Sequence, residues 1–417
     1  MSRVVQAVKL FSFVAAGGLL LVMRRVAAHD LATAEQRAPA KKKNLARTLL
    51  TVAALLVVVA LGGLLVAASG IIPIKASSGH WPITAWFLNY SMSRSISTHT
   101  LGMKAPPLDE QWMVLKGAGH YETGCRPCHS SPERPIPRVA ASMTPPPPFL
   151  PPAISEWEPE ELFYIVKHGV KFTGMPAWPT QQRDDEVWAM VAFLQQLPEL
   201  NAEEYHQLAN GGVNVQGEVV PLSDLTDPQE TPDLVIESCA RCHGLDGQGR
   251  GTGAFPKLAG QKLEYLAASL HAFAQGERQS GIMEPIAARL SPDEIHKLAQ
   301  YYGGLKPSTA RPTQQSSAEA IARGEVIARQ GLPNQRVPAC ADCHGPSEIR
   351  KNPHYPLLAG QYAEYLVLQL ELFKMKHRGG TPYAHLMHPV ANHLPPQAVH
   401  DVAQYYQSLP PDQPKPQ

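Results

Sequence analysis

The feature that most constrains this chain of 417 residues is the arrangement of its cysteines. The chain has six cysteines, and all of them belong to three copies of the pattern Cys-x-x-Cys-His. The cysteines are Cys125, Cys128, Cys239, Cys242, Cys340 and Cys343, and the histidines are His129, His243 and His344. In this pattern two thiols one helical turn apart can each add to a haem vinyl group, while the adjacent imidazole reaches the iron. The sequence therefore predicts three covalently bound haem c groups, each with a histidine as an axial iron ligand.

Other uses of the cysteines fit this pattern less well. A disulfide framework needs no histidine after every second cysteine, and disulfide-dense folds are normally much shorter. A zinc site built from two Cys-x-x-Cys pairs needs the pairs roughly 15–20 residues apart, whereas here the pairs begin at residues 125, 239 and 340. A thioredoxin-like redox pair has no use for the histidine.

The second axial ligand of each iron is predicted to be a methionine downstream of each pattern. The candidates Met175, Met283 and Met387 lie 50, 44 and 47 residues after the first cysteine of their unit. Methionine at this position closes the iron to other ligands and raises its potential. Alternatives stay open, because each methionine could instead fill a core and His385 or His388 could replace Met387. An iron without its methionine would be open, as in a peroxidase.

The chain also repeats itself. Residues 256–271 align without a gap with residues 356–371, and nine of the sixteen positions are identical. The match returns at the end of each unit, where residues 295–302 correspond to residues 399–406. A more distant copy precedes them, in which a Pro-Phe-Leu run at residues 148–150 stands where the other units have Pro-Lys-Leu and Pro-Leu-Leu. Such repeats predict units that fold alike.

Helical patterns dominate the repeated units. Apolar residues recur at helical spacing from Tyr265 to Phe273 and from Tyr365 to Phe373, and Ser291 begins a sequence with the form of a capping box. Alternating strand patterns are absent, so we predict an all-α fold whose domains are too small to bury much core without haem. The predicted boundaries are 106–210 for domain 1, 229–306 for domain 2 and 318–417 for domain 3, with linkers at 211–228 and 307–317.

The amino-terminal part has a different composition. Residues 48–74 carry no charge and are rich in leucine, valine and alanine, and this run exceeds the roughly 20 residues that span a bilayer. Basic residues precede the run. This predicts a cytoplasmic segment at 1–46, a single transmembrane anchor at 47–75 and haem domains on the periplasmic side of a bacterial inner membrane.

Two shorter segments flank the predicted anchor. The aromatic residues within 76–105 indicate a juxtamembrane interfacial segment that contacts headgroups or a membrane partner. The apolar stretch 10–23 is short for a span. It could be a signal-like segment, a second membrane helix, or untranslated sequence if synthesis starts at Met23.

Together these motifs resemble the class I cytochromes c. Each unit has the haem pattern, a proline loop, a methionine and a closing helix, and domain 1 adds Gly117 and Tyr121 ahead of the pattern. Residues 229–410 resemble in particular the dihaem cytochrome c-four family, through their Pro-x-Leu-Ala-Gly-Gln runs. The resemblance implies that a loop proline carbonyl accepts the proton on the far nitrogen of each histidine and fixes the ring. The residues concerned would be Pro148, Pro256 and Pro356.

The resemblance implies an electron-transfer protein and not an enzyme. No pair of catalytic carboxylates and no nucleophile with its base stands out, and nothing in the sequence suggests nucleic acid. Because dihaem relatives often serve as oxidase donors, we expect single electrons to pass on the periplasmic side to a haem-copper terminal cytochrome c oxidase. The alternative partner is a periplasmic dehydrogenase of the alcohol or aldehyde type, with this chain as its cytochrome subunit. Membrane lipid would surround the anchor.

Overall fold

The structure is a computed structural model that describes residues 40–72, 74–132, 134–211, 220–225, 231–251, 253–308, 317–346 and 351–411. The chain divides into two compact units, Met1–Lys75 and Ala76–Gln417. Most of the predicted cytoplasmic segment 1–46, the apolar stretch 10–23 and much of the linkers 211–228 and 307–317 lie outside the described residues.

The first unit contains the helix α2 (Ala40–Ser69). Over Leu45–Ser69 it is the one helix in the described part of the chain that is long and apolar enough to cross a membrane. The uncharged run continues to residue 74, but the helix ends earlier because Gly70 has a φ of 70°. Glycine reaches this left-handed conformation at little cost, which makes it a common helix terminator. The membrane-spanning role of α2 stays a prediction.

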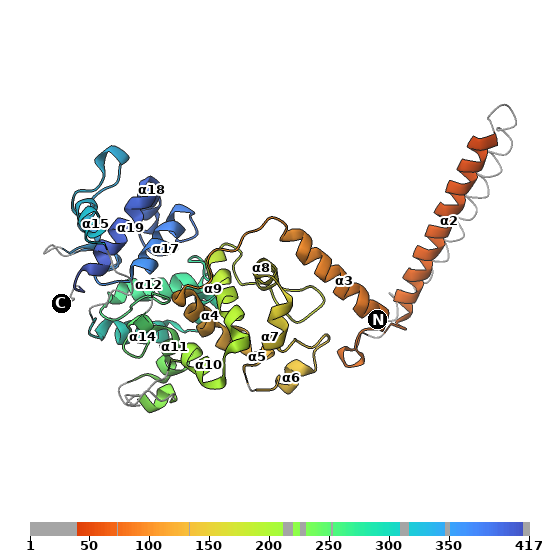
Figure 1. Cartoon of the computed structure of the whole chain (residues 1–417), viewed down its shortest axis with the longest axis horizontal. Coiled ribbons are helices and arrows are strands. Elements are labelled where there is room, and N and C mark those ends of the chain that lie inside the picture. Colours follow the sequence, from red (N-terminus) through yellow and green to blue (C-terminus); the bar gives the residue numbers. More distant parts are fainter. Residues whose placement is uncertain are drawn as a thin grey trace. The chain divides into compact units, whose positions relative to one another are not determined.

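The second unit is built from helices (Figure 1), and its described residues contain no strand. An isolated antiparallel bridge joins Leu332 to Val337. The prediction of an all-α fold is therefore confirmed. The segment 76–105 forms η1 (Ala76–Ser78) and α3 (Pro82–His99), and the carboxyl-terminal turn of α3 is tied to the next domain by a bond from Ser97 Oγ to Glu161 Oε1 of 2.9 Å.

The predicted domain 1 is organised around the crossing of its first and last long helices. The helices of this part are α4 (Gln111–Gly124), α5 (Arg126–His129), α6 (Arg138–Ala141), α7 (Leu150–Ala153), η2 (Ile154–Glu156), α8 (Pro159–His168), α9 (Asp184–Gln196), η3 (Leu197–Glu199) and α10 (Ala202–Ala209). Val114 and Tyr121 of α4 pack with Val187 and Phe193 of α9 in one buried cluster. The two helices touch at Gly117, where a Cβ atom would overlap the carbonyl oxygen of Ala189.

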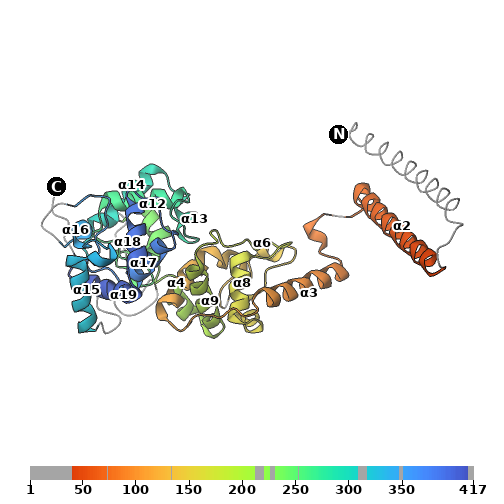
Figure 2. The same cartoon turned by 90° about the horizontal axis from the view of Figure 1, so that it is seen from above.

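The predicted domains 2 and 3 contain corresponding helices in the same order, and Figure 2 views the second unit from a second direction. The elements of domain 2 and the segment before it are η4 (Leu222–Leu225), the π-helical turn η5 (Val235–Cys239), α11 (Ala240–His243), η6 (Gly249–Gly251), α12 (Leu263–Ala274), α13 (Met283–Ala287) and α14 (Pro292–Gly304). Those of domain 3 are α15 (Ala318–Gln330), η7 (Pro333–Gln335), α16 (Ala341–His344), α17 (Ala363–Lys374), η8 (Ala384–Leu386), α18 (Met387–His393) and α19 (Pro396–Ser408).

The local helix predictions agree with these elements. The two apolar patterns fall on α12 and α17. The capping box opens α14, where the Glu294 backbone N–H donates to Ser291 Oγ at 3.3 Å and the Ser291 N–H donates to Glu294 Oε2 at 2.7 Å. These reciprocal bonds satisfy donors that the first helical turn leaves free.

Candidate haem sites

Each Cys-x-x-Cys-His pattern ends in a short helix. The helices α5, α11 and α16 close at His129, His243 and His344. The backbone N–H groups of His129 and His344 each donate to the carbonyl oxygen of the first cysteine of their pattern, at 2.9 Å. None of the six cysteines forms a disulfide, and the described residues contain no cluster of His, Cys, Asp and Glu that could hold a metal ion. This geometry offers the disulfide and zinc interpretations no support.

The three histidine rings each meet the predicted proline. The Nδ1 atom lies 3.0 Å from the Pro148 carbonyl oxygen in His129, 3.3 Å from that of Pro256 in His243 and 3.0 Å from that of Pro356 in His344. Because a carbonyl oxygen only accepts, Nδ1 carries the proton and Nε2 keeps its lone pair for a metal. The three predicted histidine–proline pairs are thus brought together in the structure.

Burial keeps these imidazoles neutral. It lowers the pKa of His243 and of His344 to about 4, although the proline carbonyl bond opposes the shift. Burial also lowers the pKa of His129. A neutral imidazole is the form that binds iron, so all three sites hold histidine in its ligating form at neutral pH.

A tyrosine holds the backbone just after each histidine. Three hydroxyl groups donate to the carbonyl oxygen of the residue that follows the pattern: Tyr121 to Ser130 at 2.9 Å, Tyr302 to Gly244 at 3.3 Å and Tyr406 to Gly345 at 2.9 Å. The tyrosine comes from the first helix in domain 1 but from the last helix in domains 2 and 3. The same hydrogen bond to the backbone after the histidine is therefore made by a tyrosine of the first helix in one domain and of the last helix in the other two.

A cavity of about 550 Å³ connects the second and third sites. It is lined by the predicted residues of both, namely Cys239, Cys242, His243, Pro256, Met283, Cys340, Cys343, His344, Pro356 and Met387. Met283 opens α13 and Met387 opens α18, and both side chains are half-buried. Of the two histidines beside Met387, His388 bonds the Arg378 carbonyl through Nε2 at 2.8 Å and His385 is exposed. These positions favour Met387 as the ligand.

The predicted ligand of the first site, Met175, lies in the loop between α8 and α9. Its backbone N–H donates to Thr173 Oγ1 at 3.1 Å, and its carbonyl oxygen accepts from Val170 at 3.2 Å. The Met175 side chain is half-buried. This loop therefore has a defined backbone conformation around the predicted ligand.

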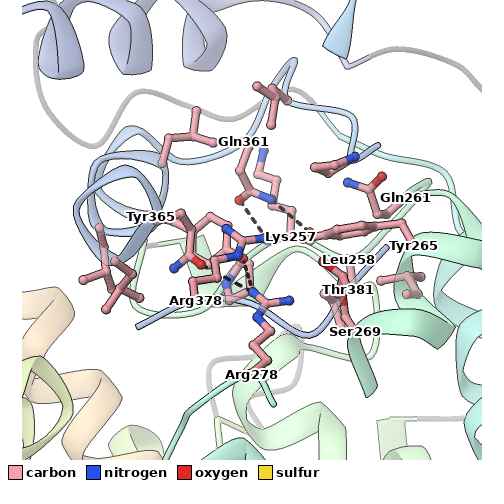
Figure 3. Close-up of a pocket in the computed structure, with 18 of the residues that line it drawn as sticks. Lys257, Leu258, Gln261, Tyr265, Ser269, Arg278, Gln361, Tyr365, Arg378 and Thr381 are labelled. Atoms are coloured by element: carbon pink, nitrogen blue, oxygen red, sulfur yellow. Dashed lines mark hydrogen bonds between the residues drawn. The ribbon is translucent and has the colours of Figure 1, made fainter. Parts of the chain in front are cut away.

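Two arginines that the motifs do not include lie in the shared cavity (Figure 3). Arg278 Nη2 of domain 2 donates to Tyr365 OH of domain 3 at 3.2 Å, and Arg378 Nη2 of domain 3 donates to Tyr265 OH of domain 2 at 2.7 Å. The arginines are only 8% and 6% exposed. Arg278 and Arg378 are 100 residues apart, as are Tyr265 and Tyr365. Extending the alignment of the repeat beyond residue 271 would therefore have identified the two arginines from the sequence.

These arginines give the cavity an excess of positive charge. No carboxylate lies within salt-bridge distance of either guanidinium in the described residues. Burial opposes ionisation of Tyr265, yet Arg378 and Arg278 lower its pKa to about 8. Buried charge without a counter-charge is costly. A haem fits this donor set, since its ring is apolar and its two propionates can accept charge-assisted bonds from guanidinium.

Comparison with known families and proteins agrees with this geometry. Residues 113–194 and 226–301 match the family model "Cytochrome C oxidase, cbb3-type, subunit III", and residues 321–410 match the model "Cytochrome c". A thiosulfate dehydrogenase electron acceptor of Thiomonas intermedia is 38% identical over 173 residues, which are 42% of this chain and 79% of that protein. A cytochrome c4 of Thiocapsa roseopersicina is 35% identical over 185 residues, covering 44% of this chain and 93% of that protein.

The relatives decide the class of function. Cytochrome c-552 of Acidithiobacillus ferridurans is 35% identical over 184 residues, covering 43% of this chain and 76% of that protein. The names of these relatives describe electron carriers and not enzymes, so the prediction of an electron-transfer protein with covalently bound haem c is confirmed. The chain belongs to the cytochrome c family and is a relative of the cytochromes c4.

Proposed function

We propose that this chain is a membrane-anchored cytochrome c with three haems, which carries single electrons along its three domains. Its central support is that one arrangement occurs three times: two cysteines that form no disulfide, a histidine beside a proline carbonyl, and a tyrosine hydroxyl that donates to the next backbone carbonyl. Haem c supplies an iron that gains and loses one electron while its ligands stay in place. The thiols would hold the haems, and the axial pairs would be His129 with Met175, His243 with Met283, and His344 with Met387.

Contacts between the domains support a continuous path. A Cβ atom at Gly119 of α4 would lie 3.1 Å from Cys242 Sγ, and Leu115 of the same helix packs in one buried cluster with Cys242 and Phe255. Since α4 leads directly to Cys125, the helix that ends at the first site touches a thiol of the second. The shared cavity then brings the second and third sites together.

The membrane part of the proposal rests on α2. Its leucine and valine side chains are largely exposed, as Leu64 at 66% and Val59 at 70% illustrate. Exposed apolar area on this scale is unfavourable in water and suits a lipid environment. With basic residues before the uncharged run of this helix, the haem domains would lie on the periplasmic side of the inner membrane.

The partners are proposed on two grounds. A relative is named a thiosulfate dehydrogenase electron acceptor, which favours a periplasmic dehydrogenase as the electron donor. The match to a family model named for subunit III of a cbb3-type cytochrome c oxidase, together with the expected anchor, favours a membrane-bound terminal cytochrome c oxidase as the acceptor. The chain would then connect the two, taking up electrons outside the membrane and delivering them at its surface.

A single preparation tests this function. The full chain, purified in mild detergent from membranes, should carry the mass of three haems and show three one-electron waves in a redox titration. Its haems should be reduced when a thiosulfate dehydrogenase and thiosulfate are added, and subunits of a haem-copper oxidase should co-purify. Recovery of a dehydrogenase subunit without an oxidase would contradict the oxidase role, and fewer than three haem masses would contradict the trihaem carrier.

A further inference from the structure

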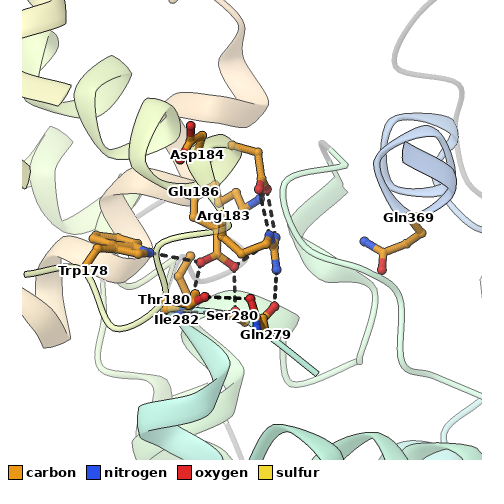
Figure 4. Close-up of polar contacts among 12 residues, drawn as sticks. Trp178, Thr180, Arg183, Asp184, Glu186, Gln279, Ser280, Ile282 and Gln369 are labelled. Atoms are coloured by element: carbon orange, nitrogen blue, oxygen red, sulfur yellow. Dashed lines mark hydrogen bonds and ion pairs between the residues drawn. The ribbon is translucent and has the colours of Figure 1, made fainter. Parts of the chain in front are cut away.

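A buried carboxylate lies between domains 1 and 2, where the motifs predict no site. Glu186 is in the first turn of α9 and is only 2% exposed. Its oxygens accept from Ser280 Oγ at 2.6 Å, from the Gly281 backbone N–H at 2.7 Å and from Trp178 Nε1 at 3.3 Å, and Arg183 Nη2 lies 3.0 Å away (Figure 4). Burial raises the pKa of Glu186, whereas Arg183 favours its ionised form. Because every partner donates, the carboxylate is used only as an acceptor.

Two of these partners belong to the loop that leads to Met283. Ser280 Oγ accepts from the backbone N–H of Ile282 at 3.3 Å and from that of Met283 at 3.0 Å. The Ser280 hydroxyl therefore links Glu186 by hydrogen bonds to the start of α13. This helix begins at the predicted iron ligand, Met283. Arg183 adds a second tie to the same loop, since its Nη1 donates to the Gln279 carbonyl at 2.7 Å.

The third partner belongs to the loop of the other predicted ligand. Trp178 follows Met175 by three residues, and its ring is 6% exposed. Its backbone N–H donates to the Lys167 carbonyl of α8 at 3.0 Å, while its indole N–H reaches Glu186. A Cβ atom at Gly281 would overlap Trp178 Nε1, so the two loops are in direct contact. One carboxylate thus holds the loops of two axial ligands.

The repeat shows that this arrangement is specific to the junction. Domain 2 has Arg278 followed by Gln, Ser and Gly, whereas domain 3 has Arg378 followed by Gly, Gly and Thr. At the position that corresponds to Ser280, domain 3 has Gly380. Glycine has no hydroxyl that could link a carboxylate to the loop by hydrogen bonds. The backbone of Gly380 approaches Glu277 Cβ of domain 2 instead. The serine is present in the repeat whose loop contacts Glu186 and absent from the other.

We propose that Glu186 is a positioning residue that fixes the Met175 loop and the Met283 loop together, so that one buried carboxylate sets methionine ligation at the first and second haems. This inference rests on the proposed function, because it requires both methionines to bind iron. The third haem, whose ligand loop does not meet Glu186, serves as an internal reference.

The test uses the haem-loaded full chain and reads each axial methionine separately, through its ring-current-shifted methyl signal in the reduced protein. Ser280→Ala removes the hydroxyl that links Glu186 to the Met283 loop, and it leaves the charge of the protein unchanged. It should weaken methionine binding at the second haem by roughly tenfold or more, as loss of a hydrogen bond to a buried charged group implies, and leave the third unchanged. Ser280→Thr, which keeps a hydroxyl, should restore the signal. Glu186→Gln should affect the first and second haems together and shift both reduction potentials.

The matched control is Asp401→Asn. Asp401 is also a buried carboxylate on a closing helix paired with an arginine, Arg323, at 2.8 Å, but it lies in domain 3. It should leave the first two methionine signals unchanged. Unaltered signals and potentials in both Glu186→Gln and Ser280→Ala would overturn the positioning role. If the unmodified protein itself lacks methionine signals from the first two haems, the proposed ligation fails instead, so the two failures are distinguishable.

Discussion

The residue after each predicted ligand histidine has an unusual backbone. Its φ is 65° at Ser130, 78° at Gly244 and 76° at Gly345. Two of the three copies use glycine, for which this conformation costs little. Ser130 is strained there, and its hydroxyl shares one proton between the carbonyl oxygens of Arg134 at 2.8 Å and Pro135 at 2.9 Å. These bonds compensate the strain locally and show how a serine can replace the glycine that the repeat otherwise uses.

The tyrosine that holds this backbone should contribute measurably to stability. In Tyr406→Phe the Gly345 carbonyl loses its buried donor, so the change should cost about 1–3 kcal/mol. The measurement is the guanidinium midpoint at which methionine ligation of the third haem is lost. Tyr383→Phe, which removes the hydroxyl of a tyrosine that is 44% exposed, is the control and should leave that midpoint unchanged. Equal midpoints for both variants would show that the tyrosine hydroxyl does not restrain the site.

The buried arginines should raise the potentials of the second and third haems. A nearby cation favours the reduced iron, which carries one positive charge less, so Arg278→Met or Arg378→Met should lower these potentials by on the order of tens of millivolts. A redox titration with three components measures the change. Arg329→Met is the control, because its side chain is 63% exposed and its charge is screened by water. Unchanged potentials in the Arg278 and Arg378 variants would contradict a role in holding propionates.

At the scale of elements, domains 1 and 3 share a crossing of their first and last helices that depends on one glycine each. In domain 3 a Cβ atom at Gly324 of α15 would overlap the Asp401 carbonyl oxygen of α19 and lie 2.8 Å from Tyr405 Cβ. In domain 1, Gly117 allows the same close contact between α4 and α9. A residue without a side chain therefore lets the two helix backbones approach closely at each crossing.

A side chain at this crossing should separate the helices. Gly324→Val should destabilise domain 3 by about 1–3 kcal/mol or more, because a tightly packed site cannot accept the added volume without strain. Gly304→Val is the matched control, since a Cβ atom at Gly304 near the end of α14 meets nothing within 4 Å. Thermal unfolding followed in the haem absorption compares the two. A similar loss in both variants would assign the effect to the helix propensity of valine and not to the crossing.

Sequence patterns predicted the parts of this molecule that depend on local chemistry. The haem motifs have a fixed spacing set by one helical turn, and α12, α17 and the cap of α14 follow from periodicity and a capping box. Glu186 gives no such signal, because its partners Ser280 and Gly281 lie more than 90 residues away along the chain. The contact between Arg278 and Tyr365 joins residues 87 apart; the repeat marks the two residues themselves but does not show that they meet. Contacts between domains arise only from folding, and a motif read along the chain does not contain them.

At the scale of the whole second unit, the domains are joined by contacts of two kinds. Between domains 2 and 3 the contacts are reciprocal: the Lys257 N–H donates to Gln361 Oε1 at 3.0 Å, and the Leu357 N–H donates to Gln261 Oε1 at 2.9 Å. Between domains 1 and 2 they are unsymmetrical and combine the Glu186 network with the packing of α4 on Cys242. Domains 2 and 3 are therefore joined symmetrically as a pair. Domain 1 is attached to this pair by different contacts and adds a further predicted haem site.

The packing of α4 on Cys242 should set how fast electrons pass between the first two haems. A Cβ atom at Gly119 would lie 3.0 Å from Phe255 Cζ and 3.1 Å from Cys242 Sγ, so the larger side chain of Gly119→Leu must push the two domains apart. We expect a slower electron transfer between the first and second haems, with all three potentials and the methionine signals unchanged. Photochemical reduction followed by time-resolved absorption measures the rate.

The control for this change is Gly304→Leu, at an exposed position with open space around it, which should leave the rate unchanged. A changed potential in Gly119→Leu would mean that the substitution disturbs a haem pocket. The change in rate would then reflect the altered difference in reduction potential and not the loss of the contact. An unchanged rate with unchanged potentials would show that electrons do not need this contact. The path through the chain would then have to cross the junction elsewhere, and the wall of the cavity formed by Lys116 and Arg183 of domain 1 would be the next place to disrupt it.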